Sequence, residues 1–226
     1  WNEVEKCEMR KDAQLARELV IALPKELTVS QNVELIKDYV QSHFVDKGMV
    51  ADICLHNDKA IDGESQPHAH VLLTMREVNL EEGKEGFGKK VREWNAKENL
   101  LMWRERWAEV ANRHLALNGH DRRIDHRRLE EQGIELTPGV KVGASAAREH
   151  MAKLIEQQKV MYENGEKIYE NPDIALRALT RQQSTFTHHD LAKFVNRHSV
   201  DSEQFERVYE KVKTSEQLVH LGLDEQ

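Results

Sequence analysis

The sequence has little cysteine, proline or glycine and no long apolar run. Of its 226 residues, 2 are Cys, 4 are Pro and 11 are Gly. Cys7 and Cys54 match neither a disulfide framework nor the spacing of a thiolate metal site, so we expect a reducing, cytoplasmic setting. No stretch approaches the roughly 18 apolar residues of a membrane-spanning helix, and the amino terminus lacks the pattern of a signal peptide. We therefore expect no membrane insertion.

Positive charge is concentrated in the middle of an acidic chain. The 33 Lys and Arg residues against 40 Asp and Glu give a net charge of -7, which argues against a protein that coats nucleic acid nonspecifically. Residues 84–128, however, hold 12 basic and 7 acidic side chains. The segment contains three basic doublets, Lys89-Lys90, Arg122-Arg123 and Arg127-Arg128. These doublets predict either contacts with phosphates or a solvated helix face.

Three short apolar runs predict the strands of one sheet: residues 16–23, 49–56 and 69–76. The second and third runs are joined by a polar loop that is too short for a parallel crossover, which predicts an antiparallel pair. Between the first two runs, apolar residues at helical spacing predict a helix that is capped near Thr28 and stops at Gly48. The expected fold class is α+β, a small antiparallel sheet with flanking helices on one face, followed by a small helical segment.

The rest of the chain predicts helices and loops. We expect an exposed helix up to about residue 14, a mobile loop over 79–90, a long amphipathic helix over 93–117 and an irregular stretch over 120–140. Trp103 and Trp107 lie four residues apart, a spacing more typical of core than of base stacking. Further helices follow from residue 144. Asn164-Gly165 and Asn171-Pro172 bracket the expected boundary between domains of residues 1–165 and 172–226.

Three histidines carry the most informative chemistry. His68 and His70 project from the same face of a strand, because strand side chains alternate with period two, and His56 ends the neighbouring strand. A hairpin would therefore gather three imidazoles, a ligand set that leaves coordination positions open on a divalent ion. Imidazoles favour Ni²⁺ or Zn²⁺, so these ions are expected to bind in vitro as well as Mg²⁺ or Mn²⁺. Glu18 on the first strand could orient one imidazole, or could simply face solvent.

Several segments in order give the chain a family resemblance. His56 followed by PHAHVLLTMR (67–76) resembles the three-histidine motif of the MobA/MobL conjugative relaxases, which belong to the HUH endonuclease superfamily. Similar segments are RKDAQLARELVIALPKEL (10–27), FVDKGMVADICLH (44–56), WRERWAEVANRHL (103–115) and IDHRRLEEQGIEL (124–136). Residues 172–226 resemble the helical start of a conjugative helicase domain, although the chain has no G-x-x-x-x-G-K-[ST] phosphate-binding motif.

The resemblance implies a function. Such relaxases are bacterial and cytoplasmic, and they nick single-stranded DNA at an origin of transfer: a tyrosine attacks the scissile phosphate, which a histidine-bound divalent ion polarises. Relaxosome proteins and a coupling protein would be the partners. The resemblance assigns the metal to His56, His68 and His70. The candidate DNA contacts are Arg76, Lys89, Lys90, Arg122, Arg123, Arg127 and Arg128.

The sequence departs from the family pattern at the nucleophile. The family tyrosine lies in an alanine-rich segment upstream of these motifs, and none of Tyr39, Tyr162, Tyr169 and Tyr209 has that setting. Because the chain opens at Trp1 in what reads as a helix already in progress, we expect an amino-terminally truncated relaxase that lacks its nucleophile. Two alternatives stay open. One is a DNA-binding fragment without catalysis, and the other is an unrelated phosphoesterase that uses a carboxylate of Asp58, Asp62 or Glu64.

Overall fold

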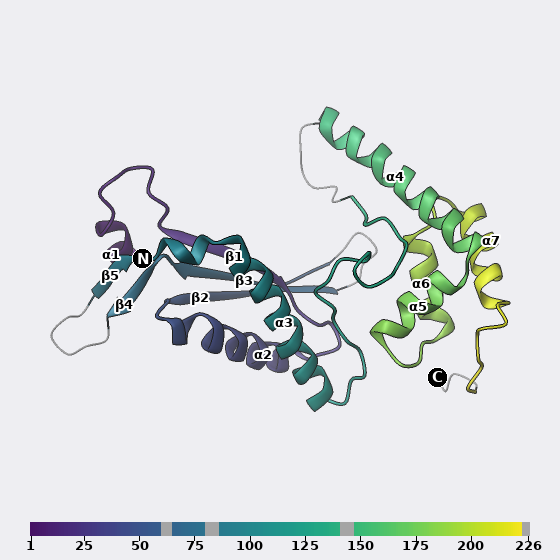
Figure 1. Ribbon diagram of the computed structural model, residues 1–226, viewed down its shortest axis with the longest axis horizontal. Coiled ribbons are helices and arrows are strands. Elements are labelled where there is room, and N and C mark those ends of the chain that lie inside the picture. The colour runs from purple at the N-terminus through teal and green to yellow at the C-terminus, as the bar shows by residue number, and fades with distance from the viewer. Residues whose placement is uncertain (60–64, 80–85, 141–146, 223–226) are drawn as a thin grey trace. The chain divides into compact units, whose positions relative to one another are not determined.

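The computed structural model describes residues 1–59, 65–79, 86–140 and 147–222, and it divides into two compact units, Trp1–His126 and Arg127–Gln226 (Figure 1). The helices and strands of the first unit are α1 (Asn2–Lys6), β1 (Ala16–Ala22), α2 (Val29–His43), β2 (Ala51–Lys59), β3 (Ser65–Thr74), β4 (Arg76–Asn79), β5 (Gly86–Lys90) and α3 (Lys97–Leu117). Short 3-10 turns cover Val45–Lys47 and Arg92–Asn95. The second unit holds α4 (Ala147–Glu170), α5 (Asp173–Gln182), α6 (His188–Arg197) and α7 (Ser202–Lys213).

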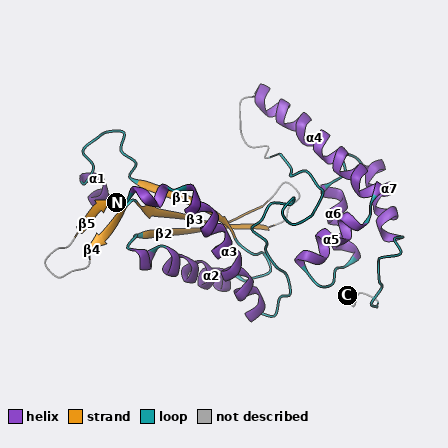
Figure 2. Cartoon of the chain, viewed as in Figure 1, coloured by secondary structure: helices purple, strands orange, loops and turns teal. Residues whose placement is uncertain are grey.

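The main sheet of the first unit is antiparallel, with β3 between β1 and β2. Alternate residues of β3 face opposite sides, so Ala69, Val71 and Leu73 are fully buried while the residues between them are less buried. The buried face packs against α2 and α3, which lie together along the sheet (Figure 2). The α+β fold class, the three strands and the helical cover on one face are thus confirmed.

Local signals in the sequence position α2 against this sheet. Thr28 and Gln31 form a capping box, in which the Thr28 hydroxyl accepts from the Gln31 amide N–H at 3.3 Å and Gln31 Oε1 accepts from the Thr28 amide N–H at 2.8 Å. The helical stretch ends at Gly48, whose φ of 90° is a left-handed conformation that favours glycine. Tyr39 is buried and donates its hydroxyl hydrogen to the carbonyl oxygen of Trp103 at 2.8 Å, which ties α2 to α3.

Two predicted elements differ from the structure. The expected amino-terminal helix covers only Asn2–Lys6 within the predicted stretch. The expected loop over 79–90 contains a strand, β5, which pairs with β4 across a β-bulge; residues 80–85 lie outside the described residues. Ion pairs from a distant segment support the β4–β5 hairpin. The Glu8 carboxylate accepts from Arg76 Nε at 3.1 Å and lies 3.1 Å from Lys90 Nζ, so tertiary ion pairs hold a sequence with weak strand character in the sheet.

The second unit is a helical cluster with its own core, and a long helix runs through the Asn-Gly pair at residues 164 and 165. α4 continues through Asn164 and Gly165 to Glu170. Asn164 is buried, accepting from the Thr137 amide N–H at 2.9 Å and donating to the Thr137 carbonyl at 2.8 Å. Gly165 lets the Gln204 side chain approach so closely that a β-carbon there would lie 2.6 Å from it. The Asn-Gly pair therefore serves helix packing. The division into two compact units falls between His126 and Arg127.

Candidate metal centre

The three histidines come together because of the strand register. His56 on β2 lies directly opposite His68 on β3. His70, two residues further along β3, lies opposite Val20 of β1 and Cys54 of β2. All of these residues belong to the face of the sheet that does not pack on α2 and α3, where the Val20 side chain is 61% exposed. The hairpin therefore presents three imidazoles on the open side of the sheet, as the sequence predicted.

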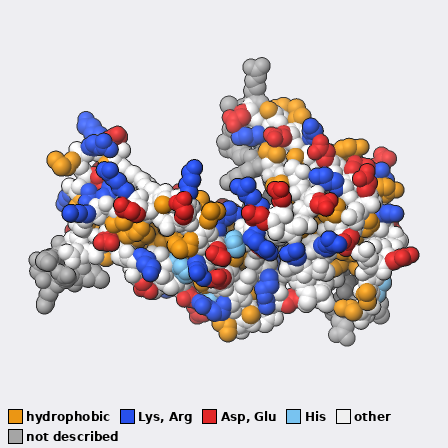
Figure 3. Space-filling model, in the orientation of Figure 1, with side chains coloured by type: hydrophobic (Ala, Val, Ile, Leu, Met, Phe, Trp, Pro, Cys, Tyr) orange, Lys and Arg blue, Asp and Glu red, His pale blue; other side chains and the backbone are white. Residues whose placement is uncertain are grey.

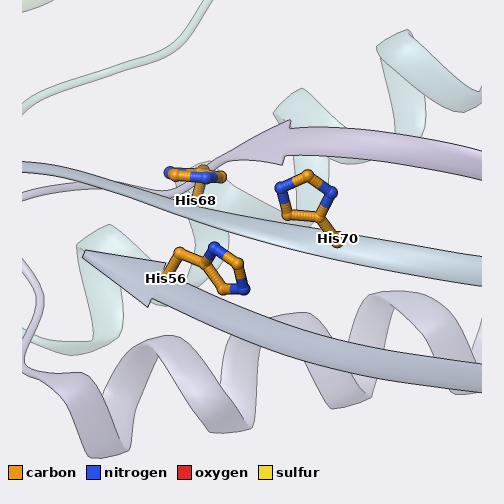
Figure 4. A group of neighbouring side chains, drawn as sticks. All are labelled: His56, His68 and His70. Atoms are coloured by element: carbon orange, nitrogen blue, oxygen red, sulfur yellow. The ribbon is translucent and has the colours of Figure 1, made fainter. Parts of the chain in front are cut away.

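The three rings face one another across the two strands (Figure 4). Ring centroids are separated by 5.3 Å for His56 and His68, 4.9 Å for His56 and His70, and 5.3 Å for His68 and His70. One ring nitrogen from each lies within 4.8 Å of the others. Two metal–nitrogen bonds of about 2.1 Å span at most about 4.2 Å, so an ion would require only a small closure of the rings.

Acceptors on either side fix which ring nitrogens are available. His70 Nδ1 lies 2.7 Å from Glu18 Oε1, and His68 Nδ1 lies 2.9 Å from the carbonyl oxygen of Gln66. A carbonyl and a carboxylate can only accept, so each Nδ1 carries a hydrogen, and in the neutral form of each ring Nε2 carries the lone pair. The structure thus places Glu18 beside an imidazole, as expected. The sequence could not reveal the hydrogen bond between His68 and the Gln66 carbonyl, because the carbonyl belongs to the backbone and every residue has one.

Asp58 lies at the same site. Its Oδ2 is 3.8 Å from His68 Nε2, the nitrogen that faces away from Gln66. Asp58 follows His56 by two residues on β2, so the two side chains share the open face of the sheet. Asp62 and Glu64, the other two carboxylates considered for water activation, lie outside the described residues.

The basic residues predicted to contact DNA do not form one patch. Arg76 and Lys90 bind Glu8, and Arg76 also donates to the carbonyl oxygen of Gly88 at 2.8 Å. Burial alone would raise the pKa of Glu8, but hydrogen bonds and attraction from both cations outweigh it and lower the pKa. Lys89, beside them on β5, is exposed. This cluster adjoins the end of β3 that lies away from His68 and His70.

The remaining predicted cations lie after α3. Arg122 forms an ion pair with Glu26 at 3.3 Å, in the segment that follows β1. Arg123 is exposed and donates to the carbonyl oxygen of His120 at 2.8 Å. Arg127 and Arg128 are exposed and belong to the second unit. Figure 3 shows Lys and Arg side chains interspersed with Asp and Glu on the face in view.

The tyrosine of the first unit is not placed to act at the histidines. Tyr39 is 2% exposed and lies in the core between α2 and α3, on the side of the sheet opposite the three rings. Desolvation raises the pKa of its hydroxyl. Tyr162, Tyr169 and Tyr209 belong to the second unit. None of the described residues forms a helix long and apolar enough to cross a membrane.

Comparison with known proteins decides the family. The MobA/MobL family profile matches residues 1–153. The chain belongs to the MobA/MobL family. Within it, the chain is 34% identical to the conjugal transfer protein TraA of Agrobacterium fabrum over 99% of its own length, and 36% identical to a probable TraA of Sinorhizobium fredii over 98%. It spans 22% of the length of each of these relatives.

Another relative and a solved structure each match just over half of the chain. The 43 kDa relaxation protein of Salmonella typhimurium is 35% identical over 53% of this chain and 37% of its own. A solved structure from work on the molecular basis of vancomycin resistance transfer in Staphylococcus aureus is 36% identical, covers 57% of this chain and 65% of its own, and has a TM-score of 0.49. The family resemblance drawn from the sequence motifs is confirmed by the profile and by the TraA relatives.

Proposed function

We propose that the chain is the metal-binding part of a conjugative relaxase, which nicks one strand of DNA at an origin of transfer. One observation carries the proposal. In a chain of the MobA/MobL family, three imidazoles converge on the open face of an antiparallel sheet, with their ring nitrogens within 4.8 Å of one another. An open face leaves room for a nucleic-acid strand beside the histidines.

His56, His68 and His70 would hold a divalent ion, Mg²⁺ or Mn²⁺ in the cell and Ni²⁺ or Zn²⁺ as alternatives in vitro. When bound, the ion would act as a Lewis acid on the scissile phosphate. The chain's own residues prepare the site. Glu18 and the Gln66 carbonyl hold the Nδ1 hydrogens of His70 and His68, so that both Nε2 lone pairs stay available without a change of tautomer.

The nucleophile of this reaction would be a tyrosine outside the present sequence. Tyr39 is buried, and its hydroxyl is bonded to the backbone of α3. Positioning of an attacking group is a large part of enzymatic acceleration, so the chain alone should bind metal and DNA without forming a covalent adduct. Residues 1–165 would be the relaxase domain, and residues 172–226 would begin a helicase domain. Relaxosome proteins and a coupling protein would be its partners in transfer.

DNA contacts in this proposal come from basic residues of both units. Arg76 and Lys90 already form ion pairs with Glu8, so they would help to form the DNA-binding surface rather than bind phosphates themselves. In the first unit, Lys89 and Arg123, whose side chains are exposed, would meet phosphates more directly, with Arg122 adding to the positive field. In the second unit, the exposed Arg127 and Arg128 would bind phosphates separately.

Calorimetry tests the metal part of the proposal. Titration of Mn²⁺ and of Ni²⁺ into the full chain should give saturable binding, and His68→Ala and His70→Ala should each weaken it, because each removes one of three ligands. His43→Ala is a matched control, since His43 lies on α2 and its ring bonds the Tyr39 carbonyl at 3.0 Å, away from the three rings. Equal metal affinities in the wild type and all the variants would show that these histidines do not bind the ion.

A covalent-trapping assay tests the nucleophile. The chain is incubated with Mn²⁺ and 3′-labelled single strands that carry a candidate origin, and the label is followed on a denaturing gel. The expected result is no label migrating with this chain. A protein extended upstream to include the family tyrosine should give an adduct that His70→Ala abolishes. An adduct that maps to one of the four tyrosines present here would contradict the assignment.

A further inference from the structure

The carboxylate of Asp58 lies beside one of the three rings, just outside the group of three imidazoles. Its Oδ2 is 3.8 Å from His68 Nε2, and two ligand bonds of about 2.1 Å span up to about 4.2 Å, so both atoms can bind one ion without a change of backbone. His68 Nδ1 is bonded to the Gln66 carbonyl, so Nε2 is the ligand nitrogen. The nitrogen that faces Asp58 is therefore the one that would face the metal.

The hairpin holds Asp58 in this position. β2 and β3 stay paired beyond the histidines, with Asn57 opposite Pro67 and Asp58 opposite Gln66. Across the same arms, the Ser65 hydroxyl donates to Asn57 Oδ1 at 2.5 Å. Asp58 is thus a residue of a paired strand and not of the loop beyond it. Its side chain is 72% exposed, so the carboxylate lies at the surface beside the three rings.

We propose that Asp58 is a fourth, anionic ligand, and that it gives the site a preference for hard ions that three imidazoles alone would not have. Imidazoles bind Ni²⁺ and Zn²⁺ well, whereas a carboxylate oxygen suits Mg²⁺ and Mn²⁺. The inference rests on the proposed function, because it concerns the same ion.

Calorimetry with Mn²⁺ and with Ni²⁺ on the full chain tests this role. Asp58→Ala should weaken Mn²⁺ binding by at least about tenfold and Ni²⁺ binding by less than about threefold. Asp58→Glu keeps the carboxylate and should recover much of the Mn²⁺ affinity. Both variants should keep the wild-type melting temperature of the metal-free protein, because the side chain is exposed.

Asp52→Ala is the matched control for loss of negative charge. Asp52 lies on the same strand and face but four residues from His56, about 13 Å away and beyond the Debye length of about 8 Å at physiological salt. The Asp52→Ala variant should bind both ions with the affinity of the wild type. If Asp52→Ala and Asp58→Ala weaken Mn²⁺ binding equally, the effect is general charge and Asp58 is not a ligand.

The remaining outcomes are also decisive. Unchanged Mn²⁺ affinity in Asp58→Ala, together with a loss in His70→Ala, would overturn the role of Asp58 and leave the three-histidine site standing. Equal losses for Mn²⁺ and Ni²⁺ in Asp58→Ala, with Asp52→Ala unaffected, would overturn the proposed ion preference. Absence of saturable binding of either ion to the wild-type chain would instead remove the proposed metal site itself, and this inference with it.

Discussion

Removal of the Glu18 carboxylate should weaken metal binding without affecting the fold. Glu18 Oε1 accepts the Nδ1 hydrogen of His70 at 2.7 Å, which holds the ring in the tautomer and orientation that leave Nε2 free for a ligand bond. In Glu18→Ala the ring can rotate or place its hydrogen on Nε2. Binding an ion then has to restore the lost arrangement, and the cost appears as a lower affinity.

The structure sets the size of this effect. Loss of a carboxylate that orients a metal-ligating histidine typically lowers metal affinity by about 10- to 100-fold. The Glu18 side chain is 56% exposed and that of His70 is 34% exposed, so water can replace part of the lost hydrogen bond. We therefore expect the lower end, about tenfold, which corresponds to about 1.4 kcal/mol of binding free energy.

The assay compares four proteins by calorimetric titration with Ni²⁺ and Mn²⁺ at one pH. Glu18→Gln retains an oxygen that can accept the same hydrogen bond, so its affinity should stay within about threefold of the wild type. Glu34→Ala, at an exposed position of α2, controls for the lost charge. Wild-type affinity in Glu18→Ala would refute the orienting role. A tenfold loss of metal affinity in Glu34→Ala as well would show that the effect comes from the change in net charge.

Three further predictions concern stability and DNA binding. Burial lowers the pKa of His198 to about 4, so the folded second unit binds fewer protons than its unfolded state between pH 6.5 and about 4. Urea unfolding should therefore show roughly 3 kcal/mol of stability lost over this window as pH falls, a loss that His198→Gln should largely lack. Tyr39→Phe removes the hydrogen bond to the Trp103 carbonyl and should lower the unfolding free energy by about 1 kcal/mol, with Mn²⁺ affinity unchanged in calorimetry. Lys89→Ala and Arg123→Ala should each reduce the salt dependence of single-stranded DNA binding, measured by fluorescence anisotropy, by roughly one phosphate contact; unchanged slopes would exclude those contacts.

The main sheet was predictable because its signals are local. β3 alternates polar or half-buried residues with buried aliphatic ones, so the sequence shows both its strand character and the face that carries His68 and His70. The capping residues of α2 are similarly local. β5 could not be predicted from its own residues, and among its tertiary contacts is the ion pair of Lys90 with Glu8, from a distant part of the chain. A glycine-rich segment has no alternation that would reveal such a contact.

In the helical second unit, too, the local sequence does not reveal the role of two residues, because that role depends on distant contacts. Asn-Gly ordinarily indicates the end of a helix, and the pair at residues 164 and 165 predicted a boundary on that basis. In the structure, Asn164 bonds the backbone of Thr137, and Gly165 admits the side chain of Gln204 from α7. Only the neighbouring segments explain these two residues. A residue type that permits either a turn or a close contact does not by itself tell which of the two the fold uses.

Period-two alternation also explains why the chain can combine a firm core with an open site. In β3 the same run of residues supplies Ala69 and Val71 to the buried face and His68 and His70 to the open face. His68 and His70 lie on the central strand, paired on both sides, and His56 lies on the neighbouring strand β2, so the separation of the rings is set by the sheet and not by flexible loops. A slip of one residue in the pairing of β3 would turn all of its histidines inward and its aliphatic residues outward. The free energy that buries Val71 and Leu73 against α2 and α3 therefore also fixes the positions of the three imidazoles.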